Sequence, residues 1–208
     1  IKKNSKFYHS ESLYWKQIKG RYKKMTLRLT GITPNGNKIY QAVEDGVRTI
    51  LTKTANERPI QSIQIRQAHE GFKGSFVDVK NLETGITHSL GDVTDLESDK
   101  LYRTITKGTV DAKGNKKEIS VTRSAAGDSF EVCHMQSKPN GEEFCHIQNQ
   151  TQTPTGLRTI EEFNTMGWTK PNGKEIFGRY RKDTMQENGN TFVQITGDIN
   201  EIPNIKEL

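Results

Sequence analysis

The tripeptide Pro-Asn-Gly constrains the fold of this chain more than any other feature, because it occurs three times, at residues 34–36, 139–141 and 171–173. Proline fixes φ of the first loop residue at about −65°, asparagine tolerates the second position, and glycine accepts a left-handed third position. This is the chemistry of a type I turn followed by a G1 bulge, which joins two antiparallel strands. Three copies therefore predict a series of antiparallel hairpins.

The hairpin at residues 130–148 allows the register of its strands to be tested. A one-residue slip would move every side chain of one strand to the other face. If residues 139–141 form the loop, His134 pairs with His146, and four residues share one apolar face: Cys133, Met135, Cys145 and Ile147. A two-residue Asn-Gly loop would divide these residues between the faces, so the three-residue loop is preferred.

The same rule predicts the pairing in the other two hairpins. It places Leu27 opposite Val43 in the first hairpin and Trp168 opposite Ile176 in the third. Each hairpin then has an apolar face and a mostly polar face. This pattern is typical of an antiparallel sheet that covers a core on one side.

Alternating apolar and polar residues predict strands along most of the chain. The predicted strands are 21–33, 38–43, 47–54, 60–67, 74–80, 85–90, 101–109, 118–123, 130–136, 143–149, 166–168, 174–182 and 190–196. Ser10 as an N-cap and Gly20 as a stop predict one short N-terminal helix, and a capping box that begins at Thr159 predicts a second near 159–165. Residues 1–9 are expected to form a flexible arm and 199–208 a tail.

We expect one all-β domain over residues 1–208, an antiparallel up-and-down meander that closes into a β-barrel, with a β-sandwich as the alternative. The basic pentapeptides 20–24 and 178–182 are similar in sequence. In a closed sheet the first and last strands meet, so the two pentapeptides would lie side by side. A chance recurrence in a basic β-protein explains them equally well.

Charge and composition limit the classes of partner. The net charge of +6 comes from lysines and arginines spread along the chain among 25 acidic residues, whereas nucleic-acid binding needs them clustered. No stretch of about 18 apolar residues predicts a membrane span. The sequon at Asn149 and a start at Ile1 favour secretion. The diagonal placement of Cys133 and Cys145 leaves a disulfide open.

The histidines His134 and His146 are the strongest candidates for site chemistry, because cross-strand imidazoles could share a metal ion. Two ligands do not complete a metal site, and no catalytic motif accompanies them, so we expect neither a metal nor a catalytic centre. Cys133 and His134 are consecutive in a strand and point to opposite faces, which excludes a nucleophile–base pair. The sequence does not identify a cofactor, so the cofactor is unknown at this stage.

The chain resembles the calycin superfamily of lipocalin-like barrels. The resemblance lies in the short helix that carries Trp15, in Gly20-Arg21-Tyr22 where lipocalins show Gly-x-Trp, in the long meander, and in an arginine near the end, Arg179 or Arg181. Tyr22 stands where the family has a tryptophan. The resemblance implies a small apolar or chromophoric ligand inside the barrel.

Three functions of different classes follow from this reasoning. The first is non-enzymatic binding of a small hydrophobic or conjugated ligand in a barrel cavity lined by Trp15, Tyr22, His134, His146, Trp168, Arg179 and Tyr180. The second is a structural or interaction protein, such as a coat or jelly-roll-like subunit that assembles with its own copies. The third is an enzyme that uses a barrel pocket, with histidines and a carboxylate as acid and base. Oligomers are compatible with all three.

Overall fold

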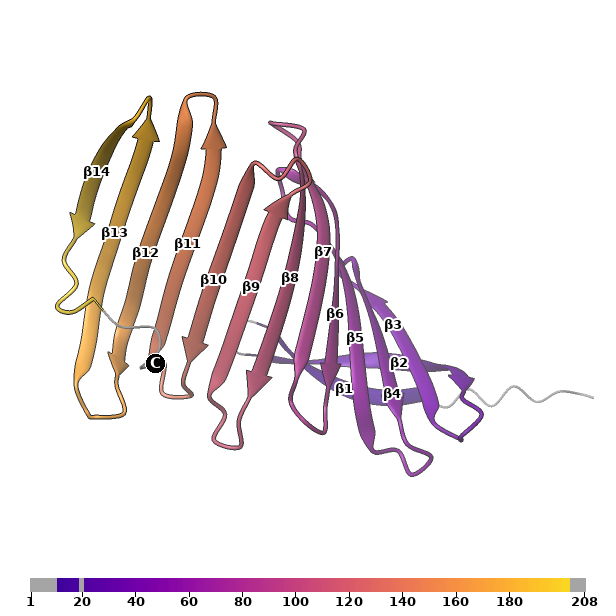
Figure 1. The fold of residues 1–208 in the computed structure, drawn as a ribbon. Helices are drawn as coiled ribbons and strands as arrows, with labels where there is room; N and C mark the ends of the chain where they lie inside the picture. The colour runs from indigo at the N-terminus through magenta and orange to yellow at the C-terminus, as the bar shows by residue number, and fades with distance from the viewer. Residues whose placement is uncertain (1–10, 19–20, 203–208) are drawn as a thin grey trace, which may run out of the picture.

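The computed structural model describes the backbone of residues 11–18 and 21–202, and the side chains from residue 26 onward except that of residue 166. These residues form one antiparallel sheet of 14 strands in sequence order (Figure 1). The strands are β1 (Glu11–Ile18), β2 (Arg21–Ile32), β3 (Lys38–Glu44), β4 (Val47–Lys53), β5 (Pro59–Gln67), β6 (Phe72–Asn81), β7 (Thr87–Asp95), β8 (Leu101–Val110), β9 (Lys116–Ser124), β10 (Ser129–Ser137), β11 (Glu143–Thr153), β12 (Gly156–Thr169), β13 (Glu175–Glu187) and β14 (Asn190–Gly197).

The three Pro-Asn-Gly loops lie at hairpin tips, which confirms the prediction. In each loop the glycine has a positive φ, and its N–H donates to the carbonyl of the residue before the proline. The bonds are Gly36 to Thr33 at 2.9 Å, Gly141 to Lys138 at 3.0 Å and Gly173 to Lys170 at 2.9 Å, with φ of 83°, 92° and 82°. The local turn chemistry therefore sets the hairpins.

The predicted register is confirmed in two of the three hairpins. His134 lies opposite His146, and Trp168 lies opposite Ile176 beyond a bulge in β12. In the first hairpin an irregularity after Leu29 shifts the pairing, so that Leu29 faces Tyr40. The predicted pairing of Leu27 with Val43 was therefore wrong.

The two predicted helices are strands, so this part of the prediction was wrong. Residues 11–18 form β1 and pair with β2, and residues 159–165 lie inside β12. The Thr159 to Glu162 segment has a capping-box sequence, but β12 pairs with β11 on one edge and β13 on the other. Pairing on both edges satisfies its backbone groups, and this outweighs the weak local preference for a helix.

The sheet is open. Each described strand is hydrogen-bonded only to its neighbours in sequence, so β1 and β14 are the two edges. The basic segments of β2 and β13 are therefore far apart in the sheet order. Figure 1 shows β1 and β2 crossing the view at a steep angle to β9–β14, as expected for the accumulated twist of a large sheet.

The sheet has two faces, which we call the front face and the back face. The front face carries Ile105 and His146, and the back face carries Thr104 and Cys145. Cross-strand partners share a face, and alternate residues along a strand lie on opposite faces. The register thus assigns each paired side chain to one face.

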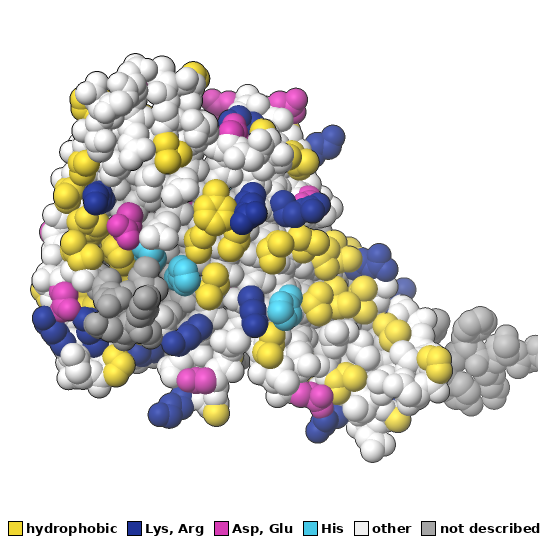
Figure 2. Space-filling view, viewed as in Figure 1, with side chains coloured by type: hydrophobic (Ala, Val, Ile, Leu, Met, Phe, Trp, Pro, Cys, Tyr) yellow, Lys and Arg dark blue, Asp and Glu magenta, His cyan; other side chains and the backbone are white. Residues whose placement is uncertain are grey.

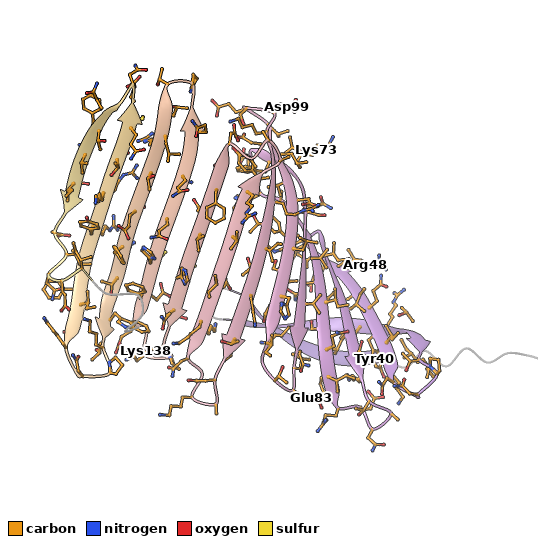
Figure 3. The ribbon with its side chains drawn as sticks, viewed as in Figure 1. Tyr40, Arg48, Lys73, Glu83, Asp99 and Lys138 are labelled. Carbon is orange, nitrogen blue, oxygen red and sulfur yellow. The ribbon has the colours of Figure 1, made fainter. Side chains whose placement is uncertain are left out.

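Two small cores lie on opposite faces of the sheet. Near the N-terminal end, the back face buries Leu27, Leu51 and Tyr40. Of these three residues, Figure 3 labels Tyr40. Near the C-terminal end, the front face buries a group that we call the aromatic core: Phe144, Phe163 and Trp168, with Tyr180 and Ile199 packed against them. The central strands between the two cores leave large apolar side chains exposed on the front face.

Candidate binding surface

An apolar band crosses the front face on strands β5–β10. It consists of two adjacent rows of cross-strand neighbours: Ile65, Val77, Leu90, Ile105, Val121 and Val132 in one, and Ile63, Val79 and Ile119 in the other. His88, Lys107 and His134 occupy the remaining three positions of the second row. Figure 2 shows this apolar surface as a group of yellow side chains across the middle of the sheet.

The band is exposed at its centre. The exposed fractions are 46% for Leu90, 56% for Ile105 and 47% for Ile119. A sheet usually buries its apolar face against another layer, because a single layer cannot remove that surface from water. The band is therefore a surface suited to contact with another molecule.

The aromatic core continues the second row of the band beyond β10. The ring of His146 stacks on Phe163 at 4.3 Å, and the ring of Phe163 is 5.9 Å from Tyr180. Phe144 lies 6.2 Å from Phe163 and 6.1 Å from Trp168. These centroid distances are typical of attractive aromatic pairs. The result is a continuous aromatic patch on β11–β13.

His146 is a buried titratable group within this patch. Its side chain is 0% exposed, and Nε2 is 3.2 Å from Oε1 of Glu161. Its Nδ1 is buried and has no hydrogen-bond partner among the described atoms. Burial lowers the pKa of His146; the carboxylate of Glu161 opposes this shift, and His134 adds to it.

This lowered pKa makes a prediction about stability. Above about pH 6.5 histidine is neutral in both states, but at lower pH the unfolded chain takes up a proton more readily than the folded one. The free energy of unfolding should fall as the pH drops through this range. His146→Gln, whose amide can still donate to Glu161, should flatten the fall. Urea unfolding at several pH values measures it.

The control for this measurement is His88→Gln, because His88 is exposed on the same face. The difference between the wild-type and His146→Gln slopes should exceed the difference for His88→Gln. Equal slopes in all three proteins would show that burial of His146 does not couple its protonation to folding.

The structure brings together four of the seven predicted site residues. His134, His146, Trp168 and Tyr180 lie on the front face of β10–β13. Trp168 is 6% exposed, and the ammonium of Lys138 lies 4.3 Å above its ring. Trp168 and Tyr180 belong to the aromatic core, and His146 is buried against Phe163 of that core, so this group is mainly a buried cluster.

The other three predicted residues lie elsewhere. Arg179 pairs with Asn164 on the back face. Trp15 and Tyr22 lie in β1 and β2 at the far end of the sheet, and their side chains are outside the described part. Sequence reasoning missed Phe144 and Phe163, although strand alternation with His146 and with Tyr180 could have placed them on the same face.

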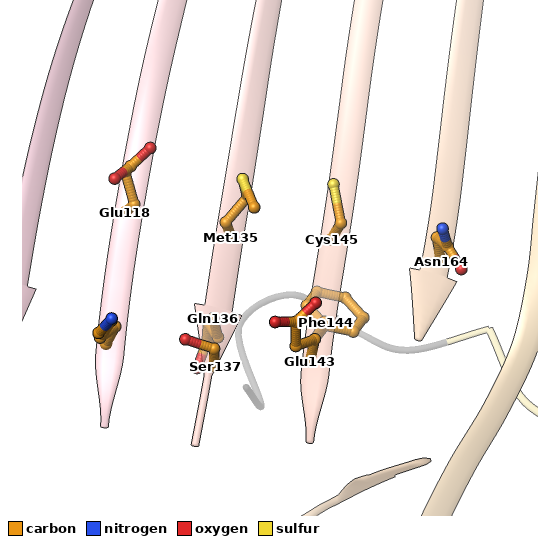
Figure 4. Close-up of a pocket in the computed structure, with 9 residues that line it drawn as sticks. Glu118, Met135, Gln136, Ser137, Glu143, Phe144, Cys145 and Asn164 are labelled. Carbon is orange, nitrogen blue, oxygen red and sulfur yellow. The ribbon is translucent and has the colours of Figure 1, made fainter. Parts of the chain in front are cut away.

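The cysteines lie on the back face, away from the band. Cys133 and Cys145 are free, with 3.8 Å between their sulfur atoms. The contact with Cys145 and burial raise the pKa of the Cys133 thiol. A shallow depression of about 200 Å³ lies beside them, with Met135 and Glu118 among its lining residues (Figure 4).

Two other features are absent from the part of the chain that the structure describes. Among the described residues, no three His, Cys, Asp or Glu side chains gather in a way that could hold a metal ion. Within the same residues there is no helix with the length and apolar character needed to cross a membrane.

No protein-family model matches this chain, and neither a curated protein nor a solved structure shows significant similarity to it. The function must be inferred from the chain's own geometry. The features available for this are the open sheet, the apolar band and the aromatic core.

Proposed function

We propose that this chain is a structural or interaction protein that associates with its own copies through the apolar band. The observation that carries the proposal is a single-layer sheet whose central apolar residues remain about half exposed on one face. Packing band against band in two copies would give a two-layer sandwich with those residues in its core.

The size of the band is suitable for such a contact. Six strands at about 4.8 Å spacing and two rows about 7 Å apart give roughly 30 Å by 15 Å in projection. One further row on each side doubles this area. The total is then comparable to the ~800 Å² that each partner contributes to a standard protein interface.

A second copy fits the band for two physical reasons. Stacked sheets pack well when their twists match, and a copy has the same twist. Within its two rows the band has one charged side chain, Lys107. Of the two flanking rows, one adds Lys117 and the other adds Asp92, Arg103 and Arg123, so most charged groups lie at the rim of the contact. Of these, Arg103 and Asp92 already pair at 2.7 Å. A twofold axis would make the contact self-complementary.

The test is Ile105→Glu, which places a charge at the centre of the band. Sedimentation at several protein concentrations should show self-association of the wild type, weakened at least about tenfold by the substitution, because a carboxylate cannot be buried unpaired. Ile32→Glu is the matched control, since Ile32 is 63% exposed and lies outside the band. Unchanged association of Ile105→Glu would contradict the proposal.

Binding of a small hydrophobic or conjugated ligand in a closed barrel is the second candidate. The gathering of His134, His146, Trp168 and Tyr180 favours it, as these were expected to line a ligand site. Closure would require β1 to pair with β14, each of which has one partner in the sheet. Native mass spectrometry with an absorption spectrum distinguishes a monomer with bound ligand from a ligand-free oligomer.

A further inference from the structure

We propose that β14 is a strand-pairing site that binds β14 of a second copy in antiparallel orientation. This contact uses the edge of the sheet, whereas the function proposed above uses its face. The two contacts are separate in space, and each can hold or fail without the other.

The backbone of β14 is available for pairing. Among the strands that the structure describes, β14 pairs with β13 alone, and all eight of its residues are exposed. Figure 1 shows it at the outer edge of the sheet. In an edge strand, the N–H and C=O groups of every second residue point away from the sheet without a strand partner. β14 therefore presents a ready template for another strand.

The sequence of β14 lacks the features that protect sheet edges. Natural edge strands are usually guarded by charged residues, proline or a bulge. β14 reads Asn-Thr-Phe-Val-Gln-Ile-Thr-Gly, without a charge or a proline, and its pairing with β13 is regular. Its large apolar side chains are more than half exposed: Phe192 at 59%, Val193 at 52% and Ile195 at 60%.

The segment that follows β14 protects the part of the β13 edge that β14 does not cover. Asn200 accepts a hydrogen bond from the N–H of Phe177 at 3.0 Å and donates one to the carbonyl of Glu175 at 3.0 Å. Asp198 accepts from the N–H of Arg179 at 3.1 Å. Side chains thus cap the first half of β13, and β14 pairs with the second half. On its outer side, β14 has no neighbouring strand among those described.

A second copy is the partner that this edge fits. Because β14 is uncharged, two copies can approach although each whole chain carries a net charge of +6. An antiparallel pair with Gln194 opposite its equivalent places Val193 opposite Ile195 of the second copy on the front face. Apolar cross-strand pairs of this kind stabilise a sheet. The front faces of both copies would also lie on the same side.

The two contacts together predict the form of the assembly. Edge pairing alone gives a dimer with one continuous sheet. Edge pairing combined with band packing gives each chain two different twofold contacts, and such a combination extends into larger assemblies unless it closes. Assemblies larger than a dimer are therefore expected for the wild type.

The experiment compares Val193→Lys with wild type by hydrogen exchange and sedimentation. In wild type, the β14 amides should become more protected as protein concentration rises. In Val193→Lys the protection should be lost and association should weaken about tenfold. Val43→Lys is the matched control, since Val43 is 68% exposed on β3, which has strand neighbours on both sides.

The variant Ile105→Glu separates the two proposals. It should form edge-paired dimers with protected β14 amides, and combining it with Val193→Lys should give monomers. If β14 amides exchange equally fast at all concentrations, the edge proposal is wrong, whatever happens to the band. Protection, in a monomer, of the β14 amides that point away from β13 would also overturn it, because β14 would then pair with a second segment of its own chain.

Discussion

Replacing Phe144 by alanine is expected to lower the free energy of unfolding by about 3–5 kcal/mol. Phe144 is 1% exposed, and its ring contacts both Phe163 and Trp168. Removing it leaves a cavity at the centre of the aromatic core, which the strands on either side cannot fill without losing their register. Urea unfolding followed by circular dichroism measures the effect.

The control is Phe177→Ala, because Phe177 is 54% exposed on β13. This substitution should change the free energy of unfolding by no more than about 0.5 kcal/mol. Equal losses for the two variants would contradict the view that a small aromatic core stabilises the C-terminal half of the sheet. A single-layer sheet buries few residues, so each residue of this core contributes a large share of the stability.

The hairpins could be predicted from sequence because their cause is local. A proline, an asparagine and a glycine decide the conformation of a turn within three residues. The turn then fixes which residues face each other, and this is why His134 was placed opposite His146. Predictions of this kind need no knowledge of the rest of the chain.

The strand conformation of the two expected helices and the open edges of the sheet could not be predicted in the same way. The capping box at Thr159 and the N-cap at Ser10 are local signals, but residues 11–18 and 159–165 pair with neighbouring strands. The irregularity between Leu29 and Gly31 has one local signal, the glycine itself, because an isolated glycine inside a strand often marks a bulge; the glycine alone does not fix the shifted register. Whether a meander closes depends on the twist summed over all strands, which no single motif records.

The apolar band was not predicted from the sequence, and strand parity explains where the predicted site residues lie. His134, His146, Trp168 and Tyr180 share one face, as the register of the hairpins implies. Arg179 is adjacent to Tyr180 in β13, so the two cannot lie on the same face. Phe163 was overlooked because its segment was predicted to be a helix.

Gly74→Ala is expected to lower the free energy of unfolding by about 2–3 kcal/mol. Gly74 lies in β6 opposite Val93, with φ of 138°, a conformation that side chains rarely adopt. A Cβ atom there would lie 2.1 Å from the carbonyl oxygen of Asp92 and 2.9 Å from the Cα of Val93. Both are backbone atoms, so β7 itself would have to move.

Gly46→Ala is the control that separates backbone strain from collision. Gly46 also has a positive φ, of 73°, but a Cβ atom there meets nothing within 4 Å. Its replacement should cost about 1 kcal/mol, the strain of a left-handed alanine. Urea unfolding of both variants gives the difference, which is the cost of separating β6 from β7. Equal costs would show that these strands, which carry Val77 and Leu90 of the apolar band, adjust freely, and that their close approach does not fix the shape of the band.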